Sequence, residues 1–407
     1  MRILFIHQNM PGQFVHLIQH LARDGRHQVA CIGRRSDFTP QGVGRVVYIL
    51  PPPTIEPNLF VSPLEMAARH GVQVVRACEA LIKNGYRPDL IVAHPGWGES
   101  LYLRDVYPDV PLLLYCEFFY RAFGADVNFD PADQQDLMAN CVTRTRNAHL
   151  LLALEAADWG YSPTAWQRAQ HPTAFRPRIS VAFDGIDTDA AKPDRAATLR
   201  LPGGQTLRSG DEVVTYVARG LEPYRGFPTF MRALPEILRR RPNAQIVIAG
   251  EDDAFYGKPP PNGGSWREVL QAELSMDWGR VHFLGRIGRS DYLRLLQVSA
   301  AHIYLTVPFV LSWSMLEAMS AGCLVIGSAT PPVLEVIEDE RNGLLVDFFA
   351  PEAIAGRVTE ALANPDAFKE IRQNARWTAL SGYGLDLCLP RQARLLEAVA
   401  AGQSPET

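Results

Sequence analysis

Short apolar runs alternate with longer amphipathic segments along this chain, and this alternation limits the folds open to it. In the first half the predicted strands are residues 2–7, 28–32, 90–93, 112–115, 159–162 and 179–182. A helical pattern over 14–23 follows the first strand, and a longer one over 63–84 precedes the third. Strands and helices that alternate in this way form a parallel sheet covered by helices. The sequence therefore predicts an α/β fold built on a doubly wound parallel sheet.

The same alternation restarts in the second half. Predicted strands there are residues 212–218, 245–250, 281–284, 302–305, 324–326 and 343–346. Because 407 residues exceed what one core usually accommodates, we expect two similar domains, 1–183 and 184–384. The polar stretch 192–208 lies close to their junction. Residues 385–407 are expected to form a last amphipathic helix, over about 389–400, and a flexible polar tail.

Composition excludes several classes of protein. The 40 basic and 44 acidic residues give a net charge of −4, so no nucleic-acid partner is expected. No apolar window is long enough for a transmembrane helix, and the N-terminus does not resemble a signal peptide. The six cysteines are scattered without a Cys-x-x-Cys pair, which is typical of reduced, buried thiols in a cytoplasmic protein.

Common cofactor motifs are absent from the sequence. It contains no P-loop and no Gly-x-Ser-x-Gly, and its histidines lack zinc-type spacing. The loop 8–13 has one glycine where a dinucleotide fingerprint has three. The pair Asp187 and Asp189 is spaced like a divalent-ion motif, but it lies at the predicted junction. We expect neither a metal nor a bound cofactor.

Candidate site residues are sought in the loops that follow predicted strands, because ligands bind there in open parallel sheets. Arg219 and Arg225 each adjoin a glycine after the strand 212–218. They can converge on a diphosphate, or they are a pair of surface arginines. Gly12, just before a helix, either lets backbone N–H groups approach an anion or forms a plain tight turn.

A second candidate loop leads from the predicted strand 302–305 into a helix. The first N–H groups of that helix are unpaired and lie at the positive end of its dipole. Ser314 and Glu317 have the spacing of a capping box, in which the carboxylate bonds a backbone N–H. The Glu317 carboxylate can instead accept both hydroxyls of a ribose. The spacing leaves both interpretations open.

Short motifs occur in a specific order over nearly the whole chain. They are Phe5–Phe14, His94–Glu99, Glu117–Tyr120, Arg219–Gly226, Phe283–Gly285, Leu316–Gly322, Val325–Gly327, Glu335–Ile337 and Asn342–Val346. In this order they resemble the retaining glycosyltransferases of family 4, in a bacterial branch. The resemblance implies a GT-B fold, in which two Rossmann-like domains face a central cleft. The first domain would bind the acceptor and the second the donor, and the last helix would cross back to the first domain.

Members of that family move a sugar from a nucleotide diphosphate sugar to an acceptor hydroxyl, with retention and without a metal. For this chain the resemblance implies a nucleotide-sugar co-substrate and a glycan, glycolipid or small-molecule acceptor. The implied donor-binding residues are Gly12, Arg219, Arg225, Gly285, Arg286, Ser312, Trp313, Ser314 and Glu317. The two arginines would also be catalytic, because they neutralise the departing diphosphate.

The chain departs from the family pattern at Phe309, at Leu311 and Ser312, which replace a Phe-Gly pair, and at Glu117. Phe309 stands where the family usually has a glutamate that contacts the donor sugar, so the sugar cannot be inferred. Glu117 stands where a histidine often follows the fourth strand of the first domain. Its carboxylate can accept the acceptor's proton or stabilise positive charge on the sugar ring. Alternatively, it bonds backbone amides as a local cap.

The acceptor side is assigned to His94, Trp97, Glu99 and Phe119, with the loop Pro51–Pro57 beside them. The basic and apolar segment 144–152 fits either peripheral contact with the cytoplasmic face of a membrane or a buried helix with a solvated end. Two other functions remain open. One is a sugar phosphorylase or nucleotide-sugar epimerase of the same fold, and the other is a non-catalytic nucleotide-sugar-binding subunit, suggested by Phe309.

Overall fold

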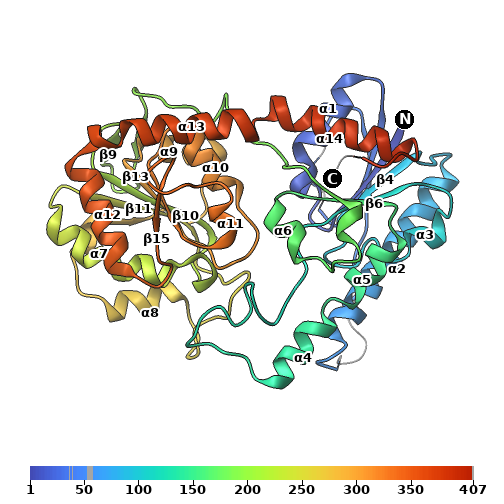
Figure 1. Cartoon of the computed structure of the whole chain (residues 1–407), viewed down its shortest axis with the longest axis horizontal. Helices are drawn as coiled ribbons and strands as arrows, with labels where there is room; N and C mark the ends of the chain where they lie inside the picture. Colours follow the sequence, from blue (N-terminus) through green and yellow to red (C-terminus); the bar gives the residue numbers. More distant parts are fainter. Residues whose placement is uncertain (36, 39, 53–57, 406–407) are drawn as a thin grey trace. The chain divides into compact units, whose positions relative to one another are not determined.

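The chain is organised as two compact units (Figure 1). The computed structural model describes residues 1–35, 37, 38, 40–52 and 58–405. The first unit combines Met1–Gly185 with Leu385–Thr407, and the second is Ile186–Gly384. Each contains one parallel sheet with helices between its strands. The predicted fold class, α/β with two doubly wound sheets, is confirmed.

The first unit has a seven-stranded sheet in the order β3-β2-β1-β4-β5-β6-β7, parallel throughout. Its strands are β1 (Arg2–Ile6), β2 (Gln28–Gly33), β3 (Val43–Val47), β4 (Leu90–Ala93), β5 (Leu112–Tyr115), β6 (Trp159–Ser162) and β7 (Ile179–Val181). The strand order reverses between β1 and β4, where Ile6 pairs with Ala93. The loops that follow these strands therefore start side by side at the sheet edge where ligands bind.

Helices cover both faces of this sheet, because alternate residues of each strand point to opposite faces. On one face α1 (Val15–Asp24) and α14 (Leu385–Ala400) pack over a buried cluster that contains Phe5, Leu17 and Leu396. On the other, α2 (Ser62–Lys83) and α5 (Ala148–Ala156) cover a cluster that contains Leu4 and Leu154. The other helices of this unit are α3 (Leu103–Val106), α4 (Leu137–Thr145) and α6 (Ala165–Gln170).

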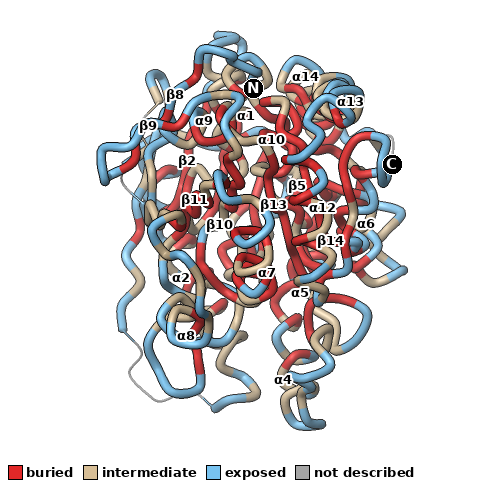
Figure 2. The backbone as a smooth tube through the Cα atoms, turned by 90° about the vertical axis from the view of Figure 1, so that its left-hand side faces the viewer, coloured by how far each residue is buried: buried red, intermediate tan, exposed pale blue. Residues whose placement is uncertain are grey.

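The second unit has a six-stranded parallel sheet in the order β12-β11-β10-β13-β14-β15. Its strands are β10 (Val213–Gly220), β11 (Gln245–Glu251), β12 (Val281–Phe283), β13 (Ala301–Tyr304), β14 (Val325–Ser328) and β15 (Leu344–Val346). Its helices are α7 (Phe227–Arg240), α8 (Trp266–Glu273), α9 (Arg289–Val298), α10 (Trp313–Ser320), α11 (Pro331–Leu334), α12 (Pro351–Ala363) and α13 (Lys369–Tyr383). The order reverses between β10 and β13, so the loops after these two strands are neighbours. Figure 2 shows the central strands as buried segments.

Three strands, β3, β8 and β9, were not predicted. The edge strand β3 has the sequence VGRVV, in which a glycine and an exposed arginine hide the strand pattern. The antiparallel hairpin of β8 (Thr198–Arg200) and β9 (Thr206–Arg208) lies in the stretch read as a polar junction. Helix α14 begins at Leu385, four residues before the predicted start, and Cys141 is exposed whereas the other cysteines are buried.

Some predictions fall outside the described residues. The predicted loop Pro51–Pro57 is described only at residues 51 and 52. The last two residues of the predicted tail are not described. Within the described ranges, no helix is both long and apolar enough to span a bilayer.

Candidate active site

Arg225 lies after β10 and holds a buried positive charge. Its Nη1 donates to Thr306 Oγ1 at 2.8 Å and to the Val310 carbonyl at 3.2 Å. The rings of Tyr256 and Phe309 lie 5.5 and 5.9 Å from its guanidinium carbon. In the described part of the chain no carboxylate is paired with it. A buried cation without a counter-charge is costly, so this site favours an anionic ligand.

Arg219 lies at the end of β10 and is exposed, with its guanidinium carbon 4.2 Å from the centre of the Phe255 ring. It lines, together with Arg225, a pocket of about 290 Å³. The other residues around this pocket are Tyr216, Val217, Ala218, Tyr256, Tyr304, Leu305, Ser312 and Ser314. The pocket therefore combines two guanidinium groups with several hydroxyl groups, a donor set that suits phosphate oxygens.

Helix α10 begins beside this pocket. Ser312 is its N-cap, and the Ser312 hydroxyl accepts a hydrogen bond from the Ser314 amide at 3.3 Å. The Ser312 amide donates to the Tyr304 hydroxyl at 2.8 Å. Since Ser312 and Ser314 both line the pocket, the positive end of the helix dipole faces it. Trp313, the first residue of α10, is not part of the lining.

Glu317 lies one turn further along α10 and does not cap it. Its Oε1 is 2.6 Å from Nη2 of Arg289, and the Tyr292 hydroxyl donates to its Oε2 at 2.6 Å. Burial, with the neighbouring carboxylate, raises the pKa of Tyr292 well above its usual value, so the phenol remains a donor. The capping-box interpretation of Glu317 is wrong. A capping box does form at Ser265 and Glu268, in α8.

Aromatic rings occupy the region where the family pattern has a glutamate. Phe309 is buried, and its ring centre is 5.3 Å from that of Tyr256. The loop that carries Tyr256 is fixed by Glu222, whose Oε2 accepts the amides of Phe255, Tyr256 and Gly257 at 3.0, 3.0 and 2.7 Å. One buried carboxylate thus orients the aromatic loop beside Arg225.

Gly285 and Arg286, which were predicted to bind the donor, lie outside the lining of this pocket, as Trp313 and Glu317 do. Gly285 has a positive φ of 61°, and its carbonyl accepts from the Gly250 amide at 3.0 Å. Arg286 is largely exposed, with Nη1 3.5 Å from Glu251. A surface ion pair therefore already accounts for the Arg286 side chain.

In the first unit Glu117 follows β5 and is held by two side chains. Gln13 Nε2 donates to its Oε1, and Nε2 of His94 lies 3.3 Å from its Oε2. The carboxylate therefore does not serve as a cap for backbone amides. The Glu117 side chain retains 24% exposure, so it is open to a ligand.

Three rings pack around this carboxylate. His94 stacks on Trp97 with ring centres 4.7 Å apart, and His7 lies 4.8 Å from His94 and 5.1 Å from Trp97. Gly12 has a positive φ of 51°, and a Cβ there would lie 2.4 Å from Nε2 of His7. A side chain is therefore excluded at Gly12 by the approach of the His7 ring.

Glu99 and Phe119, which were predicted to bind the acceptor, are buried, as His94 is. Glu99 is fully buried, and its Oε1 accepts from the Tyr48 hydroxyl at 2.6 Å and lies 3.4 Å from Nδ1 of His70. Phe119 belongs to the hydrophobic cluster under α2 and α5. Both side chains have partners inside the first unit, and their assignment to the acceptor stays a prediction. Of the other two residues predicted to bind the acceptor, His94 lies against Glu117 and Trp97 stacks on His94.

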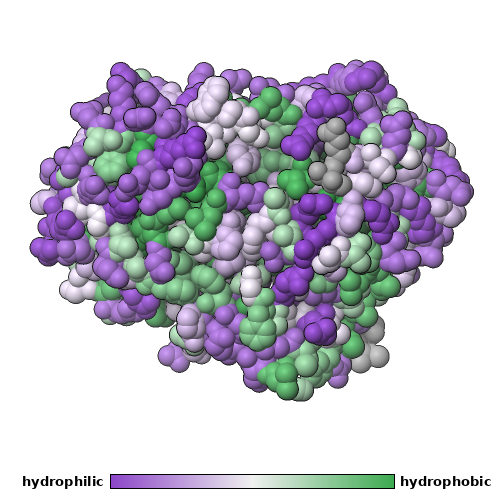
Figure 3. Space-filling view, in the orientation of Figure 1, coloured by the Kyte–Doolittle hydropathy of each residue, from purple (hydrophilic) through white to green (hydrophobic). Residues whose placement is uncertain are grey.

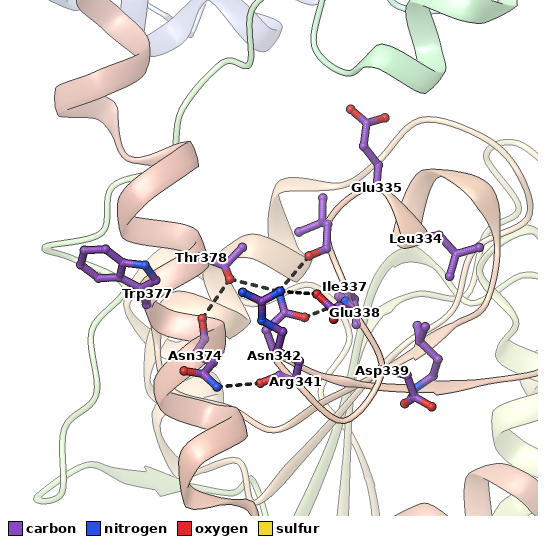
Figure 4. A pocket seen from close by; sticks show the side chains of 12 residues that line it. Leu334, Glu335, Ile337, Glu338, Asp339, Arg341, Asn342, Asn374, Trp377 and Thr378 are labelled. Atoms are coloured by element: carbon purple, nitrogen blue, oxygen red, sulfur yellow. Dashed lines mark hydrogen bonds and ion pairs between the residues drawn. The ribbon is translucent and has the colours of Figure 1, made fainter.

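A larger pocket, of about 590 Å³, lies in the second unit between α13 and the loop that precedes β15 (Figure 4). Its polar groups bond one another. The Asn342 amide donates to Thr378 at 3.0 Å, Asn374 donates to the Arg341 carbonyl, and Arg341 pairs with Glu338 (Figure 4). This pocket lies at the amino end of β15, at the sheet edge opposite Arg225, and offers no unpaired arginine for a phosphate.

Among the residues that the structure describes, no three His, Cys, Asp or Glu side chains are grouped so as to hold a metal ion. Asp187, of the pair noted above, accepts the Ala190 amide at 2.9 Å.

Several residues that lie at these sites were not predicted. Tyr304 ends β13, so the rule that ligands bind beyond strand ends points to it. Arg289 and Tyr292 lie on α9, and only the fold brings them to Glu317. Tyr256 lies in a loop without a recognisable pattern, and Gln13 is a polar side chain in an ordinary turn.

Comparison with known families and structures agrees with this geometry. Residues 25–191 match the family described as glycosyl transferase family 4 group, and residues 201–378 match glycosyl transferases group 1. A GDP-mannose-dependent α-(1-6)-phosphatidylinositol monomannoside mannosyltransferase of Mycobacterium tuberculosis is 28% identical over 50% of this chain and 52% of that protein. Spore coat protein SA of Bacillus subtilis is 25% identical over 53% and 57%. The chain thus spans about half the length of these curated relatives.

Solved structures share the fold over nearly the whole chain. Anabaena HepE in complex with UDP and glucose has a TM-score of 0.68 and 18% identity, covering 98% of this chain and 100% of that one. Sucrose-phosphate synthase from Thermosynechococcus elongatus has a TM-score of 0.73 and 19% identity, covering 99% and 100%. These similarities show the GT-B fold. The two family models, which together match most of the chain, show that the chain belongs to family 4 of the glycosyltransferases.

Proposed function

We propose that this glycosyltransferase moves a sugar, with retention and without a metal, from a nucleotide diphosphate sugar to a hydroxyl of a glycan, glycolipid or small molecule. The observation that carries the proposal is the pocket at the end of β10. There Arg219 and the buried Arg225 have no carboxylate partner among the described residues, and α10 begins beside them. Breaking the sugar–phosphate bond leaves negative charge on the diphosphate. Two guanidinium groups and a helix N-terminus can stabilise that charge without a metal ion.

Glu317 and Glu117 take the remaining roles in this proposal. Glu317 is oriented by Arg289 and Tyr292, and its remaining lone pairs accept the ribose hydroxyls. Glu117 is partly exposed and acts at the reacting centre, where a carboxylate stabilises positive charge on the sugar ring or accepts the proton of the acceptor. In a front-face displacement the leaving phosphate itself helps to deprotonate the attacking hydroxyl.

The nucleotide base and the sugar are left to experiment. One relative is named for its dependence on GDP-mannose, and one structural neighbour was crystallised with UDP and glucose. Calorimetry with UDP, GDP and ADP, in buffer containing EDTA, tests the donor site directly. We expect micromolar binding of one of them without a metal, and at least a 10-fold loss in Arg219→Ala and Arg225→Ala. Absence of binding by all three, or unchanged affinity in both variants, would refute the donor site.

The stereochemistry of transfer needs its own measurement. Nucleotide sugars of the base that binds are supplied with and without acceptor sugars, and the anomeric configuration of the first product is read by proton NMR. Retention supports the proposal, and inversion contradicts it. Accumulation of an epimer or of a sugar phosphate would favour the epimerase or phosphorylase alternative instead. Binding without any turnover would favour a non-catalytic subunit.

For localisation we propose a cytoplasmic protein that contacts the membrane peripherally. On the first unit Phe123, Leu137 and Met138 are 67, 75 and 53% exposed, and Arg144 is exposed on the same helix α4 as Leu137 and Met138. Figure 3 shows apolar surface at the position of α4. Apolar side chains beside a basic residue suit the interface of an anionic bilayer. Sedimentation with phosphatidylglycerol vesicles is expected to capture the protein, and Leu137→Ser with Met138→Ser is expected to abolish capture.

A further inference from the structure

We propose that Gln13 and His94 are positioning residues that hold the Glu117 carboxylate, and that His7 orients Gln13. The inference rests on the proposed function, because it concerns the carboxylate assigned to the reacting centre. It changes the role of His94, which the sequence assigned to the acceptor. It also gives a role to two residues, His7 and Gln13, that were not assigned to the site.

The hydrogen bonds fix the protonated nitrogen of each histidine. The Asn9 amide lies 2.9 Å from Nδ1 of His7, and the Gly96 amide lies 3.0 Å from Nδ1 of His94. A backbone N–H can only donate, so both Nδ1 atoms are acceptors. In a neutral imidazole the proton is then on Nε2. Burial, together with the nearby His94, lowers the pKa of His7 well below its usual value, which agrees with a neutral ring.

These tautomers determine which atom is the donor in each hydrogen bond of the network. The Nε2–H of His7 donates to Gln13 Oε1 at 2.8 Å, which turns the amide nitrogen of Gln13 toward Oε1 of Glu117. The Nε2–H of His94 donates to Oε2 of Glu117 at 3.3 Å. Each carboxylate oxygen therefore receives one N–H from a neutral side chain.

The backbone around Glu117 is fixed as well. Its amide donates to the Tyr115 carbonyl at 3.0 Å, and its carbonyl accepts from Gln167 Nε2 at 2.8 Å. Gly96 adds a steric constraint, since a Cβ there would lie 2.7 Å from the His94 ring. Loops that follow β1, β4 and β5 thus converge on one carboxylate, which is what preorganisation of a reacting group requires.

This arrangement has a chemical consequence. Both ring nitrogens of His7 and of His94 are engaged, so neither imidazole offers a lone pair to a substrate. The Glu117 carboxylate does offer accessible lone pairs, since its side chain is 24% exposed whereas that of His94 is 3% exposed. Any proton or positive charge handled here is therefore handled by Glu117, and the histidines act through it.

Histidine tautomers can be tested without any substrate. We expect long-range ¹H–¹⁵N spectra of the full chain, labelled with ¹⁵N-histidine, to show His7 and His94 as neutral Nε2–H tautomers at pH 7.5. His7→Gln and His94→Gln assign the two signals. Glu117→Ala is expected to shift the Nε2–H resonance of His94 and to leave that of His302, a buried histidine of the second unit, unchanged. An Nδ1–H or doubly protonated His94, or no shift, overturns the proposal.

Steady-state kinetics test whether Gln13 and His94 act through Glu117. The substrate is whichever nucleotide sugar the wild type turns over. His94→Leu and Gln13→Leu remove a donor and are expected to lower kcat 10- to 100-fold, with the donor KM and the nucleotide Kd within about twofold. His94→Gln supplies an N–H at a similar reach and is expected to restore at least half of the lost factor. His302→Gln, the control for burial, is expected to keep the wild-type kcat.

A double-mutant cycle separates positioning from a structural effect. In the Glu117→Gln background, His94→Leu is expected to lower kcat by no more than about twofold, because its partner is already altered. Equal losses in both backgrounds, or a His94→Gln variant as poor as His94→Leu, overturn the proposal. If the wild type binds no nucleotide, the proposed function fails, and the NMR result still decides whether the network holds Glu117.

Discussion

The guanidinium of Arg289 lies 2.6 Å from Oε1 of Glu317 and connects α9 to α10. The Tyr292 hydroxyl, one turn further along α9, donates to the other carboxylate oxygen. A carboxylate has about four lone-pair sites, so these two donors leave capacity for two more. Glu317 is thus an acceptor whose position is fixed before a ligand arrives, which suits recognition of a diol such as ribose.

The ribose assignment is tested with nucleotides that lack a hydroxyl. Glu317→Ala is expected to weaken binding of the preferred nucleoside diphosphate about 10- to 100-fold, since hydrogen bonds to a charged group contribute roughly 1.5–3 kcal/mol. The wild type is expected to bind the 2′-deoxynucleotide more weakly than the ribonucleotide, and Glu317→Ala is expected to bind both equally. Calorimetry measures all four affinities. If Glu317→Ala discriminates between the two nucleotides as strongly as the wild type does, contact between Glu317 and the ribose is contradicted.

Arg225 is expected to be required for nucleotide binding and to lower the stability of the protein slightly when no nucleotide is bound. Arg225→Met keeps a long side chain but removes a buried charge that has no counter-ion in the described structure, so the free energy of unfolding should stay level or rise by about 1 kcal/mol. The stabilisation that added nucleotide gives the wild type should disappear. Thermal denaturation with and without nucleotide checks both effects. A loss of more than about 2 kcal/mol would show that Arg225 is mainly structural.

Glu222 is expected to control the loop that carries Tyr256. Glu222→Ala removes the common acceptor of three amides, which we expect to cost roughly 3 kcal/mol and to expose that loop. Hydrogen exchange at residues 255–257 should accelerate, and nucleotide affinity should fall. The control is Glu251→Ala nearby, whose carboxylate pairs with the exposed Arg286 and should change stability by less than about 0.5 kcal/mol. Slow exchange in Glu222→Ala would mean that other contacts hold the loop.

Glu99 should make stability depend on pH. Burial raises the pKa of its carboxyl to about 7, above the value of 4.5 for an exposed glutamate. Between these values the folded protein keeps a proton that the unfolded chain loses, so the folded state is destabilised as the pH rises from about 4.5 to 7. Glu99→Gln removes this titration. Its stability relative to the wild type is expected to increase by about 3 kcal/mol over that interval and then to level off.

Urea denaturation at pH 5, 6, 7 and 8 measures the Glu99 effect. A stability difference between Glu99→Gln and the wild type that does not change with pH would show that the carboxyl titrates as an exposed one does.

Leu396 on α14 belongs to the core of the first unit although it follows the second unit in sequence. It is fully buried in the cluster that contains Phe5 and Leu17. Leu396→Ala is therefore expected to cost roughly 2–5 kcal/mol, as for other deep leucine truncations. The control is Leu387→Ala on the same helix, where the side chain is 46% exposed and the cost should stay below about 1 kcal/mol. A small effect at Leu396 would mean that α14 detaches readily.

Much of the fold could be predicted from the pattern of apolar residues along the sequence. Strands such as LIVA in β4 and LLLY in β5 are fully buried, so every position is apolar and the pattern is unambiguous. The edge strand β3 lacks such a pattern, because it is partly exposed and contains the exposed Arg45. The β8–β9 hairpin lacks an apolar pattern as well, because only Leu199 and Leu207 are buried among its six strand residues.

The candidate site was predictable where it follows from strand ends and less so where it depends on distant pairing. Arg219, Arg225, Ser312 and Ser314 were assigned from loops at the ends of β10 and β13, and one pocket contains all four. The hydrogen-bond partners of Glu99 could not be predicted, because the sequence does not show that Tyr48 and His70 lie beside its carboxylate. The partners of Glu117 come from loops about 100 and about 20 residues earlier, and only the pairing of β1 with β4 brings those loops together.

The first unit is discontinuous, with α14 separated from the rest by all of Ile186–Gly384. During synthesis from the N-terminus, the apolar surface of α1, including Leu17, Ile18 and Leu21, remains without its cover until about 200 further residues have been made. The second unit is continuous and can complete its own core earlier. The first unit therefore begins synthesis first and completes its core last.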